Sequence, residues 1–190
     1  ASLSRLMIGA EPPALEHRAV QTGATVLSVQ GLSLPRADQF GVDLIDLQFE
    51  VKAGEVVGIA GVSGNGQKEL LYALSGEDQR AGPASIQVAG QNAGRMGPGQ
   101  RRALGLHFVP EERLGRGAVP TMGLAHNLLL TRTNAVSGSG WIQVGALQKH
   151  AQSIIERFHV KAGGPNSAAK SLSGGNLQKF IVGREIDANP

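Results

Sequence analysis

Apolar and polar positions along the first half of the chain follow strand-like patterns. Residues 26–29 and 44–51 partly alternate between apolar and polar side chains, which predicts antiparallel strands with one face in water. Residues 56–60 carry no polar side chain, and this pattern is typical of a parallel strand buried on both faces. Residues 85–89 and 104–109 predict two further strands. The first half is therefore expected to be built around β-structure.

The second half of the chain has helical spacing instead. Apolar residues recur with this spacing from 124 to 130 and from 147 to 158, and Ser-Gly-Ser-Gly at 137–140 predicts a flexible loop between them. Residues 173–187 predict a last helix with Ser173 as its N-cap. A shorter helix is predicted after residue 66, ending at Gly76. Strands followed by an inserted helical region indicate an α/β fold.

Composition narrows the class of protein without deciding it. The 190 residues are 41% hydrophobic, enough for one globular domain with a core. Cysteine is absent, so disulfides and thiolate chemistry are excluded. A net charge of +3 gives no support for nucleic-acid binding, and no apolar run approaches the roughly 20 residues that span a bilayer. The five histidines show no metal-ligand spacing, so no metal site is predicted.

Residues 61–70, Gly-Val-Ser-Gly-Asn-Gly-Gln-Lys-Glu-Leu, have the glycine spacing of a phosphate-binding loop. They lie between a predicted strand and a predicted helix, the context that such loops require. Glycines let the backbone wrap around phosphate oxygens, and the helix N-terminus adds partial positive charge. The candidate nucleotide-binding residues are Gly61, Ser63, Gly64, Asn65, Gly66, Gln67, Lys68 and Glu69.

The loop lacks the two side chains that complete this motif. Gln67 stands at the position of the phosphate-binding lysine, and Lys68 at that of the Ser or Thr that holds Mg²⁺. Because one position along a helix turns a side chain by about 100°, we expect Lys68 to point elsewhere. A hydrogen bond to a charged group contributes about 1.5–3 kcal/mol, so binding is weakened and hydrolysis suffers more. A glycine-rich turn without a ligand is the alternative.

The segment Leu-Ser-Gly-Gly-Asn-Leu-Gln-Lys at 172–179 resembles the signature motif of ATP-binding cassette (ABC) proteins, in which glutamine is commoner than Asn176. A serine hydroxyl and glycine N–H groups at a helix start suit a γ-phosphate. A lone Ser-Gly-Gly is usually a loop, but both motifs in this order, with a helical region between them, are much more specific. Glu111 falls at the family's Q-loop position. The signature candidates are Leu172, Ser173, Gly174, Gly175, Asn176 and Gln178.

The two motifs, together with Phe-Val-Pro-Glu-Glu-Arg at 108–113, are similar to the second, C-terminal cassette of tandem importer ATPases for simple sugars and nucleosides. The resemblance covers about residues 25–190. It implies a P-loop NTPase-like ABC cassette with an incomplete mixed or parallel core sheet, an antiparallel β subdomain and an inserted helical subdomain. We expect it to be truncated before the Walker B strand, so that the catalytic glutamate and the switch histidine would follow Pro190. An adenine-stacking aromatic is not evident, and Phe40 is a weak candidate.

The resemblance also implies a division into parts. Residues 1–24 would be the linker between two cassettes, and 25–110 the β subdomain and nucleotide-binding core. Residues 111–171 would be the helical subdomain, and 172–190 the signature with the helix that returns to the core.

In ABC proteins two cassettes pair head to tail, and each ATP lies between the Walker A loop of one and the signature of the other. Residues 61–69 would then face the signature of an upstream cassette in the same polypeptide and form a weak or non-hydrolysing site. Residues 173–176 would complete the hydrolytic site on the ATP and Mg²⁺ held by that cassette. The full-length subunit would be an ATP hydrolase coupled to transport, and this fragment alone would be inactive.

The implied partners are transmembrane permease subunits, contacted through residues 111–171, with no nucleic acid and no direct membrane insertion. The implied location is the cytoplasm of a bacterium, on the inner face of the plasma membrane. The sequence does not choose between sugar and nucleoside. A nucleotide-sensing or interaction module without a transport partner is the alternative, and recovery of permease subunits with the full-length protein would discriminate. A third alternative is a phosphotransferase with a P-loop. The signature motif and the absence of the loop lysine argue against it.

Overall fold

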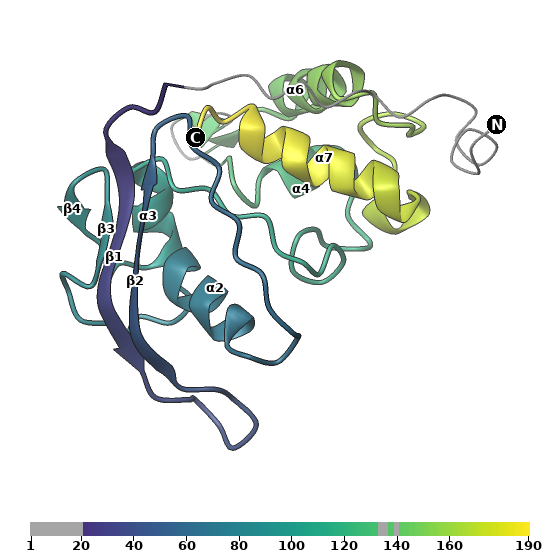
Figure 1. The fold of residues 1–190 in the computed structure, drawn as a ribbon. Coiled ribbons are helices and arrows are strands. Elements are labelled where there is room, and N and C mark those ends of the chain that lie inside the picture. Colours follow the sequence, from purple (N-terminus) through teal and green to yellow (C-terminus); the bar gives the residue numbers. More distant parts are fainter. Residues whose placement is uncertain (1–20, 133–136, 139–140) are drawn as a thin grey trace, which may run out of the picture.

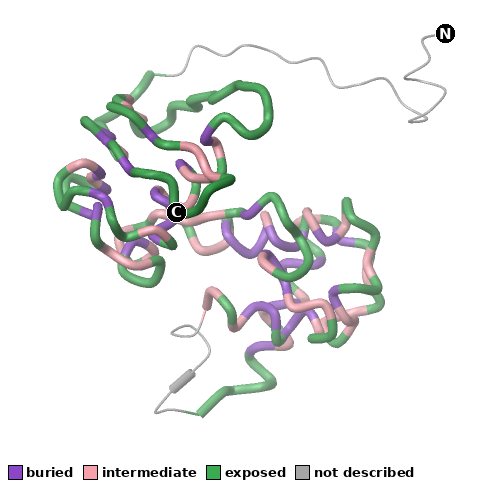
Figure 2. Tube along the Cα trace, turned by 90° about the horizontal axis from the view of Figure 1, so that it is seen from below, coloured by how far each residue is buried: buried purple, intermediate pink, exposed green. Residues whose placement is uncertain are grey.

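The computed structural model describes residues 21–132, 137–138 and 141–190, which form two packed halves (Figure 1). One half holds the strands of the first hundred residues, and the other holds the helices of the last seventy. Each half has its own cluster of buried apolar side chains. Figure 2 shows these buried residues as two groups, with the C-terminus between them. Most of the predicted linker, 1–24, lies outside the described residues.

The first half contains a four-stranded antiparallel sheet in the order β2-β1-β3-β4. The antiparallel strands predicted at 26–29 and 44–51, and the strand predicted at 85–89, are confirmed. Val29, Leu32 and Ile86 point into the cluster beneath the sheet. The strands are β1 (Thr25–Leu34), β2 (Leu44–Lys52), β3 (Ile86–Val88) and β4 (Gln91–Asn92).

Two helices, α2 (Gln67–Ser75) and α3 (Pro98–Ala103), complete this half. The predicted stop at Gly76 is confirmed: its φ is +83°, a left-handed conformation that favours glycine. Arg101 is buried beside this helix end, and burial lowers the pKa of its guanidinium. Its N–H groups donate to two backbone carbonyls in the last turn of α2, where a cation is favoured by the helix dipole, and to two in the segment before α3. The acceptors are the carbonyl oxygens of Ala73, Leu74, Gly94 and Met96.

The second half is helical, as the apolar spacing predicts. Leu124, Leu147 and Phe180 each come from a different helix and are fully buried together. Ser173 occupies the predicted N-cap position of the last helix. The elements are α4 (Leu124–Leu128), α6 (Val144–Arg157), the 3₁₀ turn η1 (Ala169–Ser171) and α7 (Gly174–Ile186).

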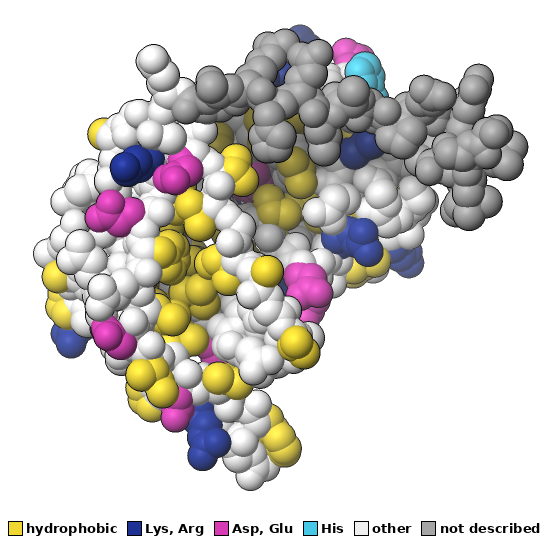
Figure 3. Space-filling model, in the orientation of Figure 1, with side chains coloured by type: hydrophobic (Ala, Val, Ile, Leu, Met, Phe, Trp, Pro, Cys, Tyr) yellow, Lys and Arg dark blue, Asp and Glu magenta, His cyan; other side chains and the backbone are white. Residues whose placement is uncertain are grey.

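The predictions of a parallel strand at 56–60 and of a further core strand at 104–109 are wrong for this structure. Neither segment pairs in a sheet, and the first is exposed throughout, with Val56 96% exposed and Ile59 57% exposed. A parallel strand exists only where a neighbouring strand supplies hydrogen bonds, and no described strand lies against either segment. The expected mixed or parallel core sheet is not found among the described residues, whose four-stranded sheet is antiparallel throughout. On the side of the molecule seen in Figure 3, hydrophobic side chains gather in a hollow.

Half of the loop predicted at 137–140 belongs to a strand. Residues of β5 (Ser137–Gly138) pair with β6 (Trp141–Ile142) in an antiparallel ladder, while 139–140 lie outside the described residues. Backbone pairing at 137–138 thus differs from the flexible loop that the Ser-Gly repeat predicts. Among the described helices, none has the length and apolar character needed to cross a membrane.

One buried carboxylate of the last helix joins the two halves. Glu185 is 3% exposed, and its Oε2 lies 2.6 Å from Nη1 of Arg102 on α3 and 3.2 Å from Nδ1 of His107. Its Oε1 accepts a hydrogen bond of 2.8 Å from Nε of Arg184, whose Nη1 donates to the Asn127 carbonyl. Because these partners come from both halves, Glu185 ties the helical half to the β half.

Candidate functional site

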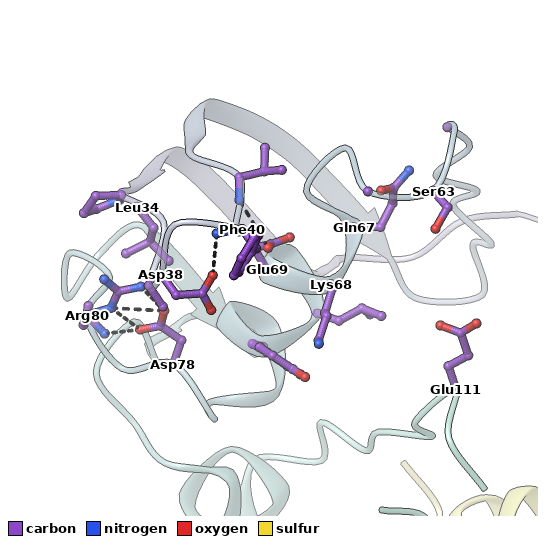
Figure 4. A pocket seen from close by; sticks show the side chains of 18 of the residues that line it. Leu34, Asp38, Phe40, Ser63, Gln67, Lys68, Glu69, Asp78, Arg80 and Glu111 are labelled. Atoms are coloured by element: carbon purple, nitrogen blue, oxygen red, sulfur yellow. Dashed lines mark hydrogen bonds and ion pairs between the residues drawn. The ribbon is translucent and has the colours of Figure 1, made fainter.

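A pocket of about 590 Å³ lies beside the glycine loop, between the β1–β2 connection and the start of α2 (Figure 4). The loop contributes Gly61, Ser63 and Gly64, and the first turn of α2 contributes three more side chains. The sequence-predicted residues in its lining are Gly61, Ser63, Gly64, Gln67, Lys68, Glu69 and Glu111. The structure thus brings the predicted loop and the predicted Q-loop position to one cavity.

The glycines of the loop have the backbone geometry that their spacing predicts. Gly64 and Gly66 have φ of +88° and +95°, in the left-handed region that β-carbon-bearing residues avoid. Gly66 is buried at the N-cap of α2, and a Cβ there would lie 3.2 Å from Leu44. The loop therefore turns tightly into the nine-residue helix and presents its N-terminus to the pocket.

The side chain of Gln67 folds back over the loop instead of extending into the pocket. Its Nε2 donates a hydrogen bond of 3.0 Å to the Val62 carbonyl, and its Oε1 accepts one of 3.0 Å from the backbone N–H of Asn65. The Asn65 side chain donates to the same Val62 carbonyl at 2.9 Å. Three hydrogen bonds inside the loop are thus made by the residues expected to hold a phosphate.

Lys68 points away from the loop, as the one-position shift predicts. Its Nζ lies 5.5 Å from the centre of the Tyr72 ring, one turn further along α2. Figure 4 shows this side chain directed away from Ser63 and Gln67. Neither candidate replacement for the phosphate-binding lysine therefore extends to the mouth of the loop.

Carboxylates outnumber cations in the pocket lining. Glu69 accepts a hydrogen bond from the Val42 N–H, and Asp78 binds Arg80, whose hydrogen bond lowers the pKa of Asp78. Arg116 binds Glu77 at 2.5 Å and the Tyr72 hydroxyl at 2.8 Å. A lining of this charge opposes a polyphosphate. The acidic members are Asp38, Glu69, Asp78, Glu111 and Glu112, and the basic members are Lys68, Arg80 and Arg116.

The described residues do not fit a Mg²⁺ ion at this loop. Lys68 replaces the hydroxyl ligand, and no group of three His, Cys, Asp or Glu side chains among the described residues could hold a metal. Phe40, the weak candidate for a stacking aromatic, lines the pocket and is 87% exposed, with its backbone N–H bound to Asp38. A flat, exposed ring at this place is compatible with stacking on a base.

The predicted signature forms the N-terminus of the 13-residue helix α7. Ser173, Gly174 and Gly175 are exposed, and the helix leaves its first N–H groups directed outward. Leu172 packs against the helical cluster, and Gln178 is half-buried on the first turns. Nη1 of Arg113 lies 3.5 Å from the Gly174 carbonyl, a contact that the sequence did not indicate. The arrangement suits recognition of an anion.

Asn176 fixes the orientation of the signature serine. Its Oδ1 accepts a hydrogen bond of 2.9 Å from the backbone N–H of Lys161, and its Nδ2 donates one of 2.9 Å to Oγ of Ser173. A backbone N–H can donate only to the oxygen of the Asn176 carboxamide. The Lys161 contact therefore assigns Oδ1 to the side that faces Lys161 and Nδ2 to the side that faces Ser173. Since Oγ accepts this bond, the Ser173 hydroxyl hydrogen remains available for donation to another group.

The glycine loop and the signature do not meet within this chain. The residues lining the pocket, all from the described part of the chain, include none of 172–178. Glu111 and Glu112 close the pocket from the side of the helical half, and Figure 4 shows Glu111 across the cavity from Gln67. Within the described part of the chain, the glycine loop and the predicted signature thus lie at separate places.

A comparison with protein families decides the relationship. The family model described as ABC transporter matches residues 44–190, most of the chain. The chain belongs to the ABC transporter family. Within this ABC match lie the glycine loop, the pocket-lining glutamates and the signature.

ABC importer proteins are among its relatives. The chain is 38% identical over 192 residues to the guanosine import ATP-binding protein NupO of Bacillus subtilis, covering 99% of this chain and 37% of NupO. It is 34% identical over 157 residues to the ribose import ATP-binding protein RbsA of Halalkalibacterium halodurans, covering 83% of this chain and 30% of RbsA. The chain therefore spans about a third of the length of these curated ABC relatives.

Solved structures confirm the ABC cassette fold. The dimeric bacterial ABC transporter cassette MJ0796 matches with a TM-score of 0.66 and 17% identity, covering 86% of this chain and 70% of that one. The ATP-binding cassette MJ1267 matches with a TM-score of 0.65 and 19% identity, covering 87% and 66%. At these identities the likeness shows the fold alone.

Proposed function

We propose that this chain is part of the ATP-binding subunit of an importer for simple sugars or nucleosides, and corresponds to its second cassette. The relatives named for guanosine and ribose import support the transport role. On this proposal, the subunit sits in the cytoplasm against the inner face of the membrane. It binds permease subunits through the helical half.

The two phosphate-binding elements have different roles in this proposal. The glycine loop is a weak or non-hydrolysing ATP site, because Gln67 and Lys68 replace both catalytic side chains and the lining is acidic. The signature is an intact, exposed helix start with a hydroxyl donor at Ser173. It completes the hydrolytic site on ATP and Mg²⁺ held by an upstream cassette.

The observation that carries this division is the separation of the two elements. No signature residue lines the pocket of the loop, although both elements are in the described part of the chain. A γ-phosphate held at either element is therefore covered on one side only, and a second cassette must supply the other side.

The purified chain alone is expected to show little or no ATP turnover. Position 67 of the loop holds glutamine in place of lysine, and no metal site is found among the described residues, so the charge that stabilises the transition state is missing. Release of inorganic phosphate from ATP would be measured against a buffer blank. Turnover of one per second or faster, within the ordinary enzyme range, would contradict the proposal.

Replacing Asn176 by aspartate should reduce ATP turnover of the full-length protein by tenfold or more. The carboxylate still accepts from the Lys161 N–H, but it accepts a hydrogen bond from Ser173 instead of donating one. The hydroxyl hydrogen then turns away from the phosphate, and a negative charge is added beside it. An acidic side chain at a helix N-terminus stabilises the helix, so the loss is not expected to reflect unfolding.

The matched control is Asn166→Asp, which adds the same charge at an exposed position of the helical half. Phosphate release by both variants would be compared with the wild type at saturating ATP. If Asn176→Asp stays within twofold of the control, Asn176 does not orient the signature serine.

A further inference from the structure

We infer that Gln67 is an internal latch that competes with nucleotide for the glycine loop, and thereby sets the low affinity of this site. The inference rests on the proposed function of the loop as a nucleotide site. It assigns to Gln67 a role opposite to that of a ligand: the side chain occupies the loop when no phosphate is present.

The position of the amide carries the first step. Gln67 Nε2 lies so close to the loop backbone that a Cβ built on Gly61 would be 2.6 Å from it. Gly61 and Gln67 both line the pocket, so the carboxamide lies against the loop backbone on its pocket side. A phosphate oxygen that reaches the loop from the pocket would meet the carboxamide.

The hydrogen bonds carry the second step. A phosphate-binding loop works through backbone N–H groups that point inward at the anion. Here the N–H of Asn65 is already bound by Gln67 Oε1, and the carboxamide is held at its other end by the Val62 carbonyl. Nucleotide can use that N–H only after both bonds break. The apparent affinity is reduced by the fraction of molecules in which the loop is open.

Gly61 offers a way to displace the Gln67 carboxamide by a substitution elsewhere in the loop. Its φ is not in the left-handed region, and the atom that a Cβ would meet is the far end of a flexible side chain. Gly61→Ala should therefore displace the carboxamide at little cost to the backbone. This variant opens the latch without touching Gln67, which separates loss of the latch from loss of the glutamine.

The test follows hydrogen exchange at the Asn65 amide in the full-length protein, with and without the non-hydrolysable analogue AMP-PNP. Without nucleotide, the amide should exchange faster in Gln67→Ala and Gly61→Ala than in the wild type, because its acceptor has gone. With AMP-PNP, half-maximal protection of the amide should need about tenfold less nucleotide in Gln67→Ala, as expected for two lost hydrogen bonds. Gln152→Ala, a half-buried glutamine on α6, is the control.

Weaker protection by AMP-PNP in Gln67→Ala would make Gln67 a ligand of the phosphate and overturn the latch. Unchanged exchange and unchanged protection would also overturn it. Gln67→Lys distinguishes an error in the latch from an error in the proposed nucleotide site. If AMP-PNP protects the amide in Gln67→Lys but protection of Gln67→Ala is no stronger than that of the wild type, only the latch is wrong. If AMP-PNP protects the amide in no variant, including Gln67→Lys, the loop is not a nucleotide site, and both the latch and the proposed site are wrong.

Discussion

Replacing Ser173 by arginine in the full-length protein is expected to lower ATP turnover by a hundredfold or more. Oγ of Ser173, at the exposed start of α7, accepts a hydrogen bond from Nδ2 of Asn176, so its hydroxyl hydrogen remains available for donation. Loss of one such donor to the transition state typically costs about 10²–10³ in rate. Arginine also fills the space in front of the helix N-terminus, where the proposed γ-phosphate of the partner cassette would lie.

Steady-state phosphate release by the purified full-length protein measures this effect. Ser153→Arg makes the same chemical change at an exposed position of α6 and should leave turnover near the wild-type rate. Gln67→Ala should cost much less than Ser173→Arg, because it changes the loop that is proposed not to hydrolyse ATP. A greater loss in Gln67→Ala than in Ser173→Arg would refute the asymmetric pair of sites.

Local patterns predicted the elements that depend on local contacts. The alternation at 26–29 and 44–51 predicted β1 and β2, and the spacing from 147 to 158 predicted α6. The strands predicted at 56–60 and 104–109 are not formed in the structure, because strand formation depends on a neighbour distant in the sequence, which no periodicity describes. The predicted burial of the apolar run at 56–60 is also wrong, since this segment is exposed.

The candidate site divides in the same way. Glycine spacing predicted the left-handed turn at Gly64 and Gly66, because backbone conformation follows from residue type. The fold-back of Gln67 and the contact of Asn176 with Lys161 depend on side-chain conformation and on segments brought together by folding. The sequence shows that Gln67 and Asn176 occupy two motif positions. Only the structure shows that Gln67 folds back over its loop and that Asn176 contacts the Ser173 hydroxyl.

Replacing Glu185 by glutamine should lower the free energy of unfolding by about 3 kcal/mol, since loss of one partner of a buried ion pair typically costs about 3–5 kcal/mol. Glutamine keeps the shape but removes the charge that neutralises Arg184, which is 2% exposed, and Arg102. Urea unfolding of the purified chain, followed by circular dichroism, measures the change. Glu50→Gln, on the exposed face of β2, is the control and should stay within about 0.5 kcal/mol of the wild type.

The Glu185 carboxylate should also determine how the free energy of unfolding falls with pH in acid. Burial raises the pKa of Glu185, but the hydrogen bond from Arg102 and the charge of Arg184 outweigh it, so the net pKa lies below the ordinary 4.5. Its contribution is therefore complete above about pH 4.5 and is lost as the pH falls through the lowered pKa.

His107, beside the same carboxylate, adds a second step at higher pH. Burial and the charge of Arg102 lower the pKa of its imidazole from 6.5, so its neutral form contributes stability that begins to be lost below about pH 6.5. In Glu185→Gln the decline below pH 4.5 should be shallower, because position 185 no longer titrates, while the decline assigned to His107 persists. An acid limb as steep in Glu185→Gln as in the wild type would show that Glu185 does not join the two halves through its charge.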